Sequence, residues 1–223
     1  AGLYKLVYAL PQSEHNFEFI YNGTETIEFN FDNETGVEFT SSKENQLLHG
    51  YTQSMAFAHN ELMQLYAQPT MDDINYIRLA QKIDSLQNSY EAQSKGTIAA
   101  HFITASKTYI PTKVETANTY VSEVKAHYFE AINFQDAILQ SSNFIVDKSL
   151  DYILRIHFSG TPSFQEYQAN IDAVFKALET TDLAYQLTTL NTIRESLITA
   201  GHNALAVYLT KTYVLPLAIQ LND

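Results

Sequence analysis

The side chains best suited to acid–base or metal chemistry are seven histidines, and their spacing predicts no shared site. None pairs with another at the i+3 or i+4 spacing that puts two ligands on one helical turn, and no His-Glu-x-x-His motif occurs. His49 and His59 are the nearest to a pair, but ten residues is about 15 Å along a helix, too far for one metal ion. We expect surface or boundary positions for all of them: His15, His49, His59, His101, His127, His157 and His202.

Carboxylates and nucleophiles form no catalytic motif either. Asp72 and Asp73 begin a predicted helix, where their charge stabilises the helix dipole, so a structural role accounts for them. There is no Gly-x-Ser-x-Gly elbow, phosphate-binding glycine loop or dinucleotide fingerprint. Cysteine is absent, which excludes thiolate nucleophiles, disulfides and cysteine-type zinc sites. The sequence thus predicts no catalytic, cofactor-binding or metal-binding residue and no cofactor.

A catalytic triad of serine, histidine and aspartate from distant segments of the chain is not excluded, because such a triad is recognised by geometry rather than by sequence order. A hydrolase is accordingly the weakest of three functional hypotheses. Two stretches, Asn22-Gly23-Thr24 and Asn33-Glu34-Thr35, match glycosylation acceptors, but the turn-forming chemistry of asparagine accounts for both.

Composition and charge exclude several kinds of partner. The net charge of −12 and the scattered Lys and Arg residues disfavour nucleic acid and anionic membrane surfaces, which both need a basic face. No apolar run approaches the roughly 20 residues that span a bilayer, so no membrane insertion is expected. The N-terminal residues hold no basic segment followed by a hydrophobic one, so no signal peptide is expected within this chain, which opens directly on strand-like sequence. We interpret this opening as the mark of an upstream portion that has been removed.

Residues 1–41 predict an antiparallel meander of four short strands. The first runs from Leu3 to Leu10 and ends at Pro11, and Asn22-Gly23 supplies a hairpin signal after the second. A further turn is expected between Asp32 and Gly36. The alternating apolar residues of the later strands are Phe17, Phe19 and Tyr21, then Ile27, Phe29 and Phe31, then Val37 and Phe39.

The opposite face of this meander is acidic. Residues 1–41 hold one lysine against seven carboxylates, a net charge of −6, which is half of the total. We interpret it as a solvated face whose charges deter edge pairing, with a docking surface for a basic partner as the alternative.

From Ser41 onward the hydrophobic period lengthens from 2 to about 3.6 residues, which predicts helices. Ser41 with Glu44, and Thr70 with Asp73, fit capping boxes of two long helices, the first ending at Pro69. These helices are expected to pack as an antiparallel hairpin. Their apolar stripes are Leu47, Tyr51, Met55, Ala58, Leu62 and Leu65, then Tyr76, Leu79, Ile83, Leu86 and Tyr90.

The remaining sequence predicts shorter helices. A break is expected at Tyr109-Ile110-Pro111 and another near Ser141-Ser142, and Thr161-Pro162 is a start signal. The helix after it is expected to bury Phe164, Tyr167, Ile171, Val174, Phe175 and Leu178. The other helices are expected over residues 97–108, 113–131, 134–157, 182–200 and 202–215.

These patterns predict an α+β fold. Residues 1–41 form a small antiparallel β-sheet segment, interpreted as part of a larger β-domain, and residues 42–223 form a larger helical domain. No 34-residue self-similarity occurs, so the helical domain is expected to be irregular rather than a tetratricopeptide array.

Several segments together resemble a known protein region. They are Gly2-Leu3-Tyr4, Phe17 through Gly23, Ile27-Glu28-Phe29, Ser41 through Asn45 leading to Tyr51, and later Asn133-Phe134 through Phe144, Lys148 and Tyr152-Ile153. This pattern resembles the N-terminal non-catalytic region of bacterial envelope thioredoxin-family proteins, which are thiol–disulfide oxidoreductases. There, a β-domain of unknown function and a helical region precede a thioredoxin domain with a Cys-x-x-Cys pair. Because this chain has no cysteine, no catalytic residue carries over.

The resemblance implies a non-catalytic accessory module, periplasmic or envelope-anchored, that positions or selects partners for a redox domain absent from this chain. Its partner would be another protein or its own thioredoxin-like domain, with a homodimer as a further option. The alternative is a free-standing envelope binding protein for a peptide, a glycan or an apolar ligand. Candidate contact residues are helical aromatics, for most of which core packing is the favoured interpretation: Tyr51, Tyr76, Tyr90, Tyr120, Tyr128 and Tyr167.

Overall fold

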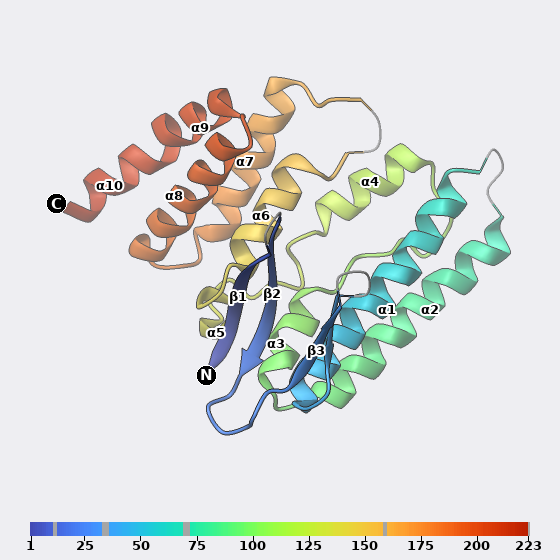
Figure 1. Cartoon of the computed structure of the whole chain (residues 1–223). Coiled ribbons are helices and arrows are strands. Elements are labelled where there is room, and N and C mark those ends of the chain that lie inside the picture. The colour runs from blue at the N-terminus through green and yellow to red at the C-terminus, as the bar shows by residue number, and fades with distance from the viewer. Residues whose placement is uncertain (11–12, 33–35, 69–71, 158–159, 223) are drawn as a thin grey trace. The chain divides into compact units, whose positions relative to one another are not determined.

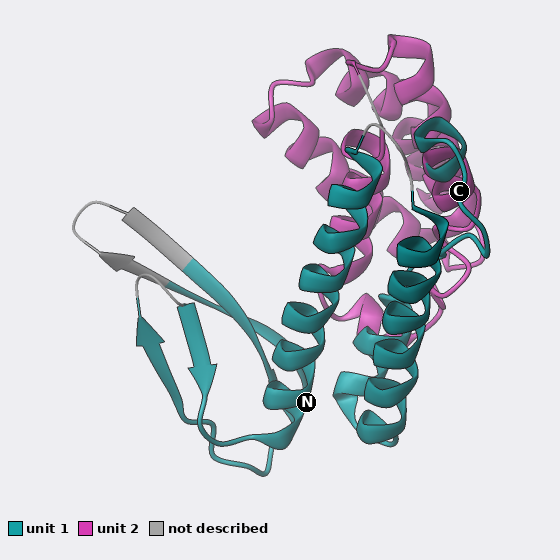
Figure 2. Ribbon diagram, turned by 90° about the vertical axis from the view of Figure 1, so that its right-hand side faces the viewer, with its two compact units in different colours: residues 1–120 teal, residues 121–223 magenta. Residues whose placement is uncertain are grey.

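The computed structural model describes residues 1–10, 13–32, 36–68, 72–157 and 160–222 (Figure 1). Strands occur only near the N-terminus of this described part and helices follow them, so the predicted α+β class is confirmed. The chain divides into two compact units, residues 1–120 and residues 121–223, shown in teal and magenta in Figure 2. All four strands belong to the first unit together with several helices. The predicted domain boundary after residue 41 stays a prediction.

The strands form two separate two-stranded sheets instead of the predicted four-stranded meander. β1 (Gly2–Leu10) pairs antiparallel with β2 (Ser13–Tyr21), from Gly2 opposite Tyr21 to Leu10 opposite Ser13. β3 (Phe29–Asp32) pairs with β4 (Gly36–Phe39). Pro11 and the loop residues 33–35, with the second sequon, lie outside the described residues.

Asn22-Gly23 does not form the predicted hairpin between paired strands. The Asn22 side-chain oxygen accepts hydrogen bonds from the Thr24 and Glu25 amides at 3.0 and 3.3 Å, an Asx-type turn that redirects the chain. The connection from β2 to β3 is therefore longer than a two-residue hairpin, and in the described part of the chain these strands do not pair.

Aromatic rings link the two small sheets. The Phe17 ring centroid lies 4.8 Å from that of Phe29 and 6.2 Å from that of Phe39. The prediction that Phe17, Phe19 and Tyr21 form the buried face of β2 is only partly right, since Tyr21 is 39% exposed whereas Ile20 is fully buried. Ile20 points to the other face, so β2 has apolar contacts on both sides.

Helix α1 (Lys43–Tyr66) begins one residue later than its predicted cap. Ser42, at φ +65°, is the N-cap, and its hydroxyl accepts from the Asn45 amide. Ser41 instead accepts from the Glu28 amide at 2.7 Å, which ties it to the strand segment. Glu44 accepts from the Ala99 amide at 3.1 Å, in the first turn of α3 (Ile98–Ala105). The two residues of the predicted capping box, Ser41 and Glu44, therefore form hydrogen bonds with other segments of the chain instead of with each other's backbone.

Helix α2 (Asp73–Ser94) is capped by Asp72, whose carboxylate accepts from the Ile74 and Asn75 amides at 2.9 and 3.2 Å. The predicted cap Thr70, like Pro69, lies outside the described residues.

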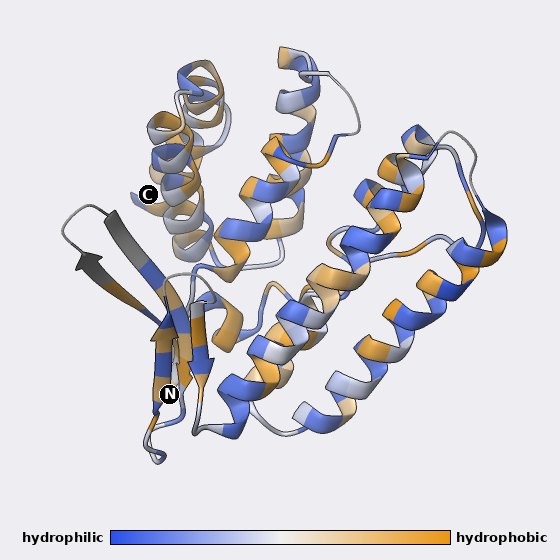
Figure 3. Cartoon of the chain, turned by 45° about the vertical axis from the view of Figure 1, so that its right-hand side comes forward, coloured by the Kyte–Doolittle hydropathy of each residue, from blue (hydrophilic) through white to orange (hydrophobic). Residues whose placement is uncertain are grey.

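α1 and α2 run side by side as the predicted hairpin (Figures 1 and 3). Figure 3 shows hydrophobic and hydrophilic residues alternating along both helices. The predicted stripes are buried except at Leu86 and Tyr90, which are half-buried. Gln87 takes the deeper position, only 1% exposed, since its amide finds a full set of partners.

The second unit is helical, and α4 (Ala117–Ala126) runs across the division. α5 (Ala137–Gln140) and α6 (Phe144–Leu154) are separated at Ser141-Ser142, which confirms that predicted break. α4 is shorter than the predicted helix over 113–131. α7 (Phe164–Leu178), α8 (Leu183–Thr199) and α9 (Asn203–Leu209) follow.

Helix α7 starts two residues after the predicted Thr161-Pro162 signal. Ser163 is the N-cap and forms a complete capping box with Glu166. Phe164, the first helical residue, is 46% exposed, contrary to prediction. Ile171, Val174 and Leu178 form the buried stripe that was expected.

The C-terminal helix continues past its predicted end at residue 215. α9 passes through a π-helical turn (Thr210–Val214) into α10 (Leu215–Asn222). Pro216 has no amide hydrogen for the Thr212 carbonyl and would clash with it in a regular helix. The Leu215 amide donates instead to Thr210, five residues back, so the π turn accommodates the proline.

This C-terminal stretch also qualifies the expectation of no apolar run. Within the described residues, one helical segment, Asn203–Asn222, is long and apolar enough to cross a membrane by length and composition, with a mean hydropathy of 1.4. It contains Lys211, and its Leu205, Leu209, Val214 and Leu217 side chains are buried, whereas Val207, Leu215, Ile219 and Leu221 are exposed, so 28% of the apolar window is buried.

Candidate ligand-binding site

The first unit holds a pocket whose polar floor is the Gln87 carboxamide. Tyr51 of α1 donates its hydroxyl to Gln87 Oε1 at 2.8 Å. Gln87 Nε2 donates to Glu91 Oε1 at 2.7 Å and to the Ile103 carbonyl at 3.0 Å. Both polar atoms of this amide have partners, so the buried Gln87 carboxamide is held in place by groups of the protein itself.

A tyrosine fixes the outer wall. The hydroxyl of Tyr76, fully buried on α2, donates to the Pro111 carbonyl at 2.8 Å and holds the segment 107–112 against the helix. Tyr66 packs edge-on against Tyr76 at 6.1 Å and lies 4.7 Å from Tyr120. Burial raises the pKa of Tyr51, Tyr76 and Tyr120 well above the ordinary value, so these hydroxyls stay protonated donors.

The pocket between α1, α2 and residues 107–112 has a volume of about 430 Å³, within the range of small-molecule sites. Its lining is mainly apolar, with a polar rim at the mouth. The lining residues are Met55, Ile77, Ala80, Gln81, Ile83, Asp84, Gln87, Lys107, Thr108, Tyr109, Ile110, Pro111 and Thr112.

One cationic and one anionic side chain, Lys107 and Asp84, lie among the residues that line this mainly apolar pocket. Lys107 and Asp84 are exposed, and Asp84 also accepts a hydrogen bond from Asn88 at 3.0 Å. Ile77 is 46% exposed at the mouth. An apolar opening with a few polar groups at its edge is suited to holding an apolar group with a polar end.

Sequence reasoning missed this site because its parts are ordinary when taken singly. Tyr109-Ile110-Pro111 predicted only a break, and Gln87, four residues after Ile83 on the buried face of α2, is polar and so was not part of the predicted apolar stripe. The signal that could have found the site was the apolar Tyr-Ile-Pro run inside a loop. Such a run would be exposed to water unless it packs against another part of the protein.

The histidines are not brought together into a metal site. Among the described residues no group of three His, Cys, Asp or Glu side chains could hold a metal ion. His59 Nδ1 lies 2.8 Å from the Met55 carbonyl of its own helix, and His127 Nδ1 lies 2.6 Å from Glu130. Neither of these contacts is with a serine hydroxyl. The side chain of His15 lies outside the described residues.

The tyrosines singled out from the sequence divide evenly between core and boundary. Tyr51, Tyr76 and Tyr120 are buried, and Tyr90, Tyr128 and Tyr167 are half-buried. Core packing is therefore confirmed for the first three, and none of the six is exposed. The Asn22 side chain is engaged in the turn described above, which supports the structural explanation of its sequon.

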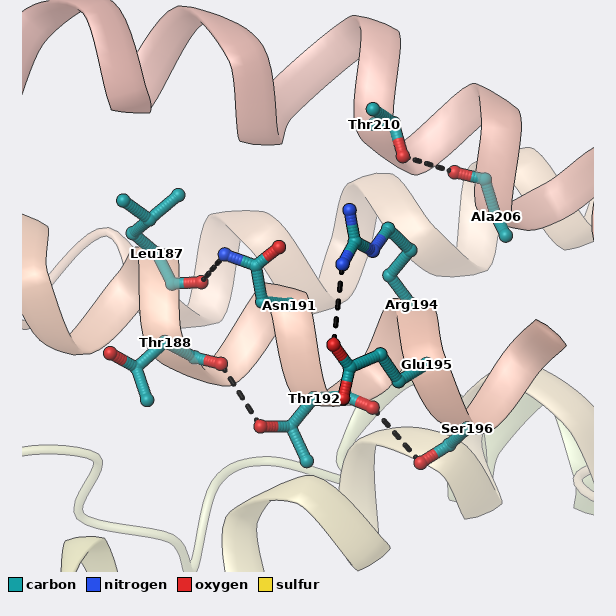
Figure 4. Close-up of polar contacts among 9 residues, drawn as sticks. All are labelled: Leu187, Thr188, Asn191, Thr192, Arg194, Glu195, Ser196, Ala206 and Thr210. Carbon is teal, nitrogen blue, oxygen red and sulfur yellow. Dashed lines mark hydrogen bonds and ion pairs between the residues drawn. The ribbon is translucent and has the colours of Figure 1, made fainter. Parts of the chain in front are cut away.

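A second hollow lies beside α8, where Thr192, Glu195, Ser196, Thr199 and Ala200 line about 380 Å³. Figure 4 shows two of its hydroxyls bonded within their own helix: Thr192 donates to the Thr188 carbonyl at 3.1 Å and Ser196 to the Thr192 carbonyl at 2.9 Å. Glu195 is engaged with Arg194 at 3.3 Å. This hollow is the smaller of the two and is lined mainly by polar side chains, so the pocket on Gln87 is the stronger candidate.

Comparison of the chain with protein-family models, with curated proteins and with solved structures found no match. The resemblance to the envelope thioredoxin family accordingly stays a prediction.

Proposed function

We propose that this chain is a non-catalytic binding module whose pocket between α1, α2 and residues 107–112 holds an apolar ligand, or the apolar end of a larger one. The observation that supports it is an apolar opening of about 430 Å³ built on a fully hydrogen-bonded floor. A preformed pocket binds without the cost of ordering its own walls.

Binding of the apolar fluorescent probe N-phenyl-1-naphthylamine tests this proposal, since the chain has no tryptophan to overlap with the signal. Ile77→Glu places a charge at the pocket mouth on a side chain that is already 46% exposed, so the fold tolerates it. We expect saturable binding by the native chain and a loss of about tenfold or more in Ile77→Glu, equivalent to about 1.4 kcal/mol.

Ile74→Glu is the matched control. Ile74 lies one turn earlier on α2 and is 79% exposed, but it does not line the pocket. It is expected to leave probe affinity unchanged. Equal losses in both variants, or no saturable binding by the native chain, would remove the basis of the proposal.

A second proposal, that the chain is the accessory region of an envelope thioredoxin-like protein, rests on the resemblance alone. In that case the pocket would take an apolar segment of a protein partner. Competition of a leucine-rich peptide with the bound probe would favour a protein ligand, whereas a medium-chain fatty acid that competes alone would favour the free-standing binding protein.

A further inference from the structure

Two opposite charges lie on different walls of the pocket on Gln87. Asp84 belongs to helix α2, whereas Lys107 follows the end of α3 by two residues and begins the segment 107–112. Both side chains are exposed, and both line this one pocket. The few polar groups of a mainly apolar pocket orient its ligand, so these two charges bear on the class of ligand that it holds.

Asp84 has no counter-ion on its own helix. The residues three or four positions away, which share its side of α2, are all uncharged: Ala80, Gln81, Gln87 and Asn88. Asn88 donates to the carboxylate through Oδ2 alone, so Oδ1 is left to accept from another group. Lys82, the nearest cation in the sequence, is paired with Glu61 at 2.6 Å.

Lys107 also lacks a counter-ion. Within the described part of the chain its ammonium group makes no ion pair and no hydrogen bond, and no ion pair joins it to Asp84. A ligand with a single negative charge would gain from Lys107 but be repelled by Asp84, and a cationic ligand would meet the reverse. Only a ligand with one charge of each sign gains from both walls.

We propose that the pocket takes a ligand with an apolar body and a zwitterionic head. The apolar body lies in the cavity, the ammonium group of the head pairs with Asp84, and its acidic group, a phosphate or a carboxylate, pairs with Lys107. This inference rests on the proposed function, since it names the ligand class of the same pocket. A head without net charge also avoids the repulsion that a chain of net charge −12 exerts on anions.

Displacement of bound N-phenyl-1-naphthylamine by three decyl compounds, each below its micelle-forming concentration, tests this inference on the full chain. Decylphosphocholine carries both charges, decyl phosphate only the negative one and decyltrimethylammonium only the positive one. We expect decylphosphocholine to displace the probe at about three- to fivefold lower concentration than either singly charged compound, a gain typical of ion pairs at an exposed rim. Phenylalanine, with both charges on a short apolar body, separates an amino-acid ligand from a lipid-like one.

Two variants assign each charge to its wall. Lys107→Gln is expected to weaken binding of decylphosphocholine and decyl phosphate several-fold, and not that of decyltrimethylammonium. Asp84→Asn is expected to weaken binding of decylphosphocholine and decyltrimethylammonium, and not that of decyl phosphate. Lys95→Gln and Glu179→Gln are the matched controls, because they change the net charge equally at exposed residues that do not line the pocket. Unchanged affinity for the naphthylamine probe shows that each variant keeps the pocket.

The outcomes separate this inference from the proposed function. Saturable probe binding with no advantage of decylphosphocholine over one of the singly charged compounds would overturn the zwitterionic head and leave the apolar pocket standing. The absence of saturable probe binding would overturn both. Equal effects of Lys107→Gln and Lys95→Gln, or of Asp84→Asn and Glu179→Gln, would show that net charge acts at long range and that the rim residues do not contact the head.

Discussion

Asn45 connects strand β2 to helix α1 through one buried amide. Its Oδ1 accepts from the Ile20 amide at 2.6 Å, and its Nδ2 donates to the Ile20 carbonyl at 2.8 Å and to the Ser42 hydroxyl at 2.7 Å. The residue is only 2% exposed. The Asn45 amide bonds the N–H and the C=O of Ile20, as the backbone of a neighbouring strand would. Removing it lowers the stability of the fold, because water does not reach these two backbone groups to replace the lost hydrogen bonds.

Asn45→Ala is therefore expected to lower the free energy of unfolding by about 2–4 kcal/mol, since two buried backbone groups lose their partner. Asn60→Ala on the exposed side of the same helix should change it by less than about 0.5 kcal/mol. Urea denaturation followed by circular dichroism measures both. Equal stability of the two variants would show that Ile20 finds other partners.

At the scale of elements, the π turn joins α7 to the C-terminal helix. Tyr208 and Tyr213 both donate to Asp172 Oδ1 at 2.7 Å, and Tyr213 stacks on Phe175 with ring centroids 4.1 Å apart. Tyr213 lies five positions after Tyr208. In a regular α-helix two residues five positions apart point to different sides, whereas the wider π turn brings these two side chains to the same side. The turn that accommodates Pro216 therefore also brings both tyrosines to Asp172.

Asp172→Ala is expected to cost about 2 kcal/mol, because two half-buried hydroxyls lose a charged acceptor. In a chain that already carries Tyr208→Phe and Tyr213→Phe, the same change should cost less than about 1 kcal/mol. A double-mutant cycle of urea unfolding measures the difference. Identical costs in both backgrounds would mean that the carboxylate stabilises the fold through other contacts.

At the scale of the whole molecule, the tyrosine-rich core predicts how stability depends on pH. Burial raises the pKa of Tyr51, Tyr76 and Tyr120 above the ordinary value of 10.0. The folded chain then keeps protons that the unfolded chain loses, so the stability from these tyrosines is fully present below pH 10 and falls as pH rises above it. Their phenolates cannot form without opening the core.

We expect urea midpoints to be flat from about pH 8 to about pH 9.5 and to fall steeply beyond about pH 10. Tyr51→Phe should make that fall shallower, because it removes one of the titrating groups, whatever its effect on stability at lower pH. Phenolate absorbance of the native chain that rises at the same pH as that of the urea-unfolded chain would contradict the prediction.

Features of this fold that depend on residues close together along the chain could be predicted from the sequence, whereas those that depend on distant residues could not. The stripes Tyr51 to Leu65 and Tyr76 to Ile83 were predictable, since each repeats within a few residues of one helix. The caps were predicted one or two residues away from their true places, at Ser41 instead of Ser42 and Thr161 instead of Ser163. Two neighbouring hydroxyls can each serve as the N-cap of a helix, and a contact with a residue elsewhere in the chain decides which one does. At α1 this contact is the hydrogen bond from the Ser42 hydroxyl to Glu25.

The sequence by itself determined the class of the fold, its helices and the lack of a recognisable catalytic motif, because periodicity and composition are local properties. Only the tertiary structure decided which strands pair, which polar residues are buried and where the pocket lies. Those features depend on contacts such as Ile20 with Asn45 and Tyr51 with Gln87, between residues far apart along the chain. A buried Gln87 is stable only because distant groups satisfy its amide, and no local pattern records that arrangement.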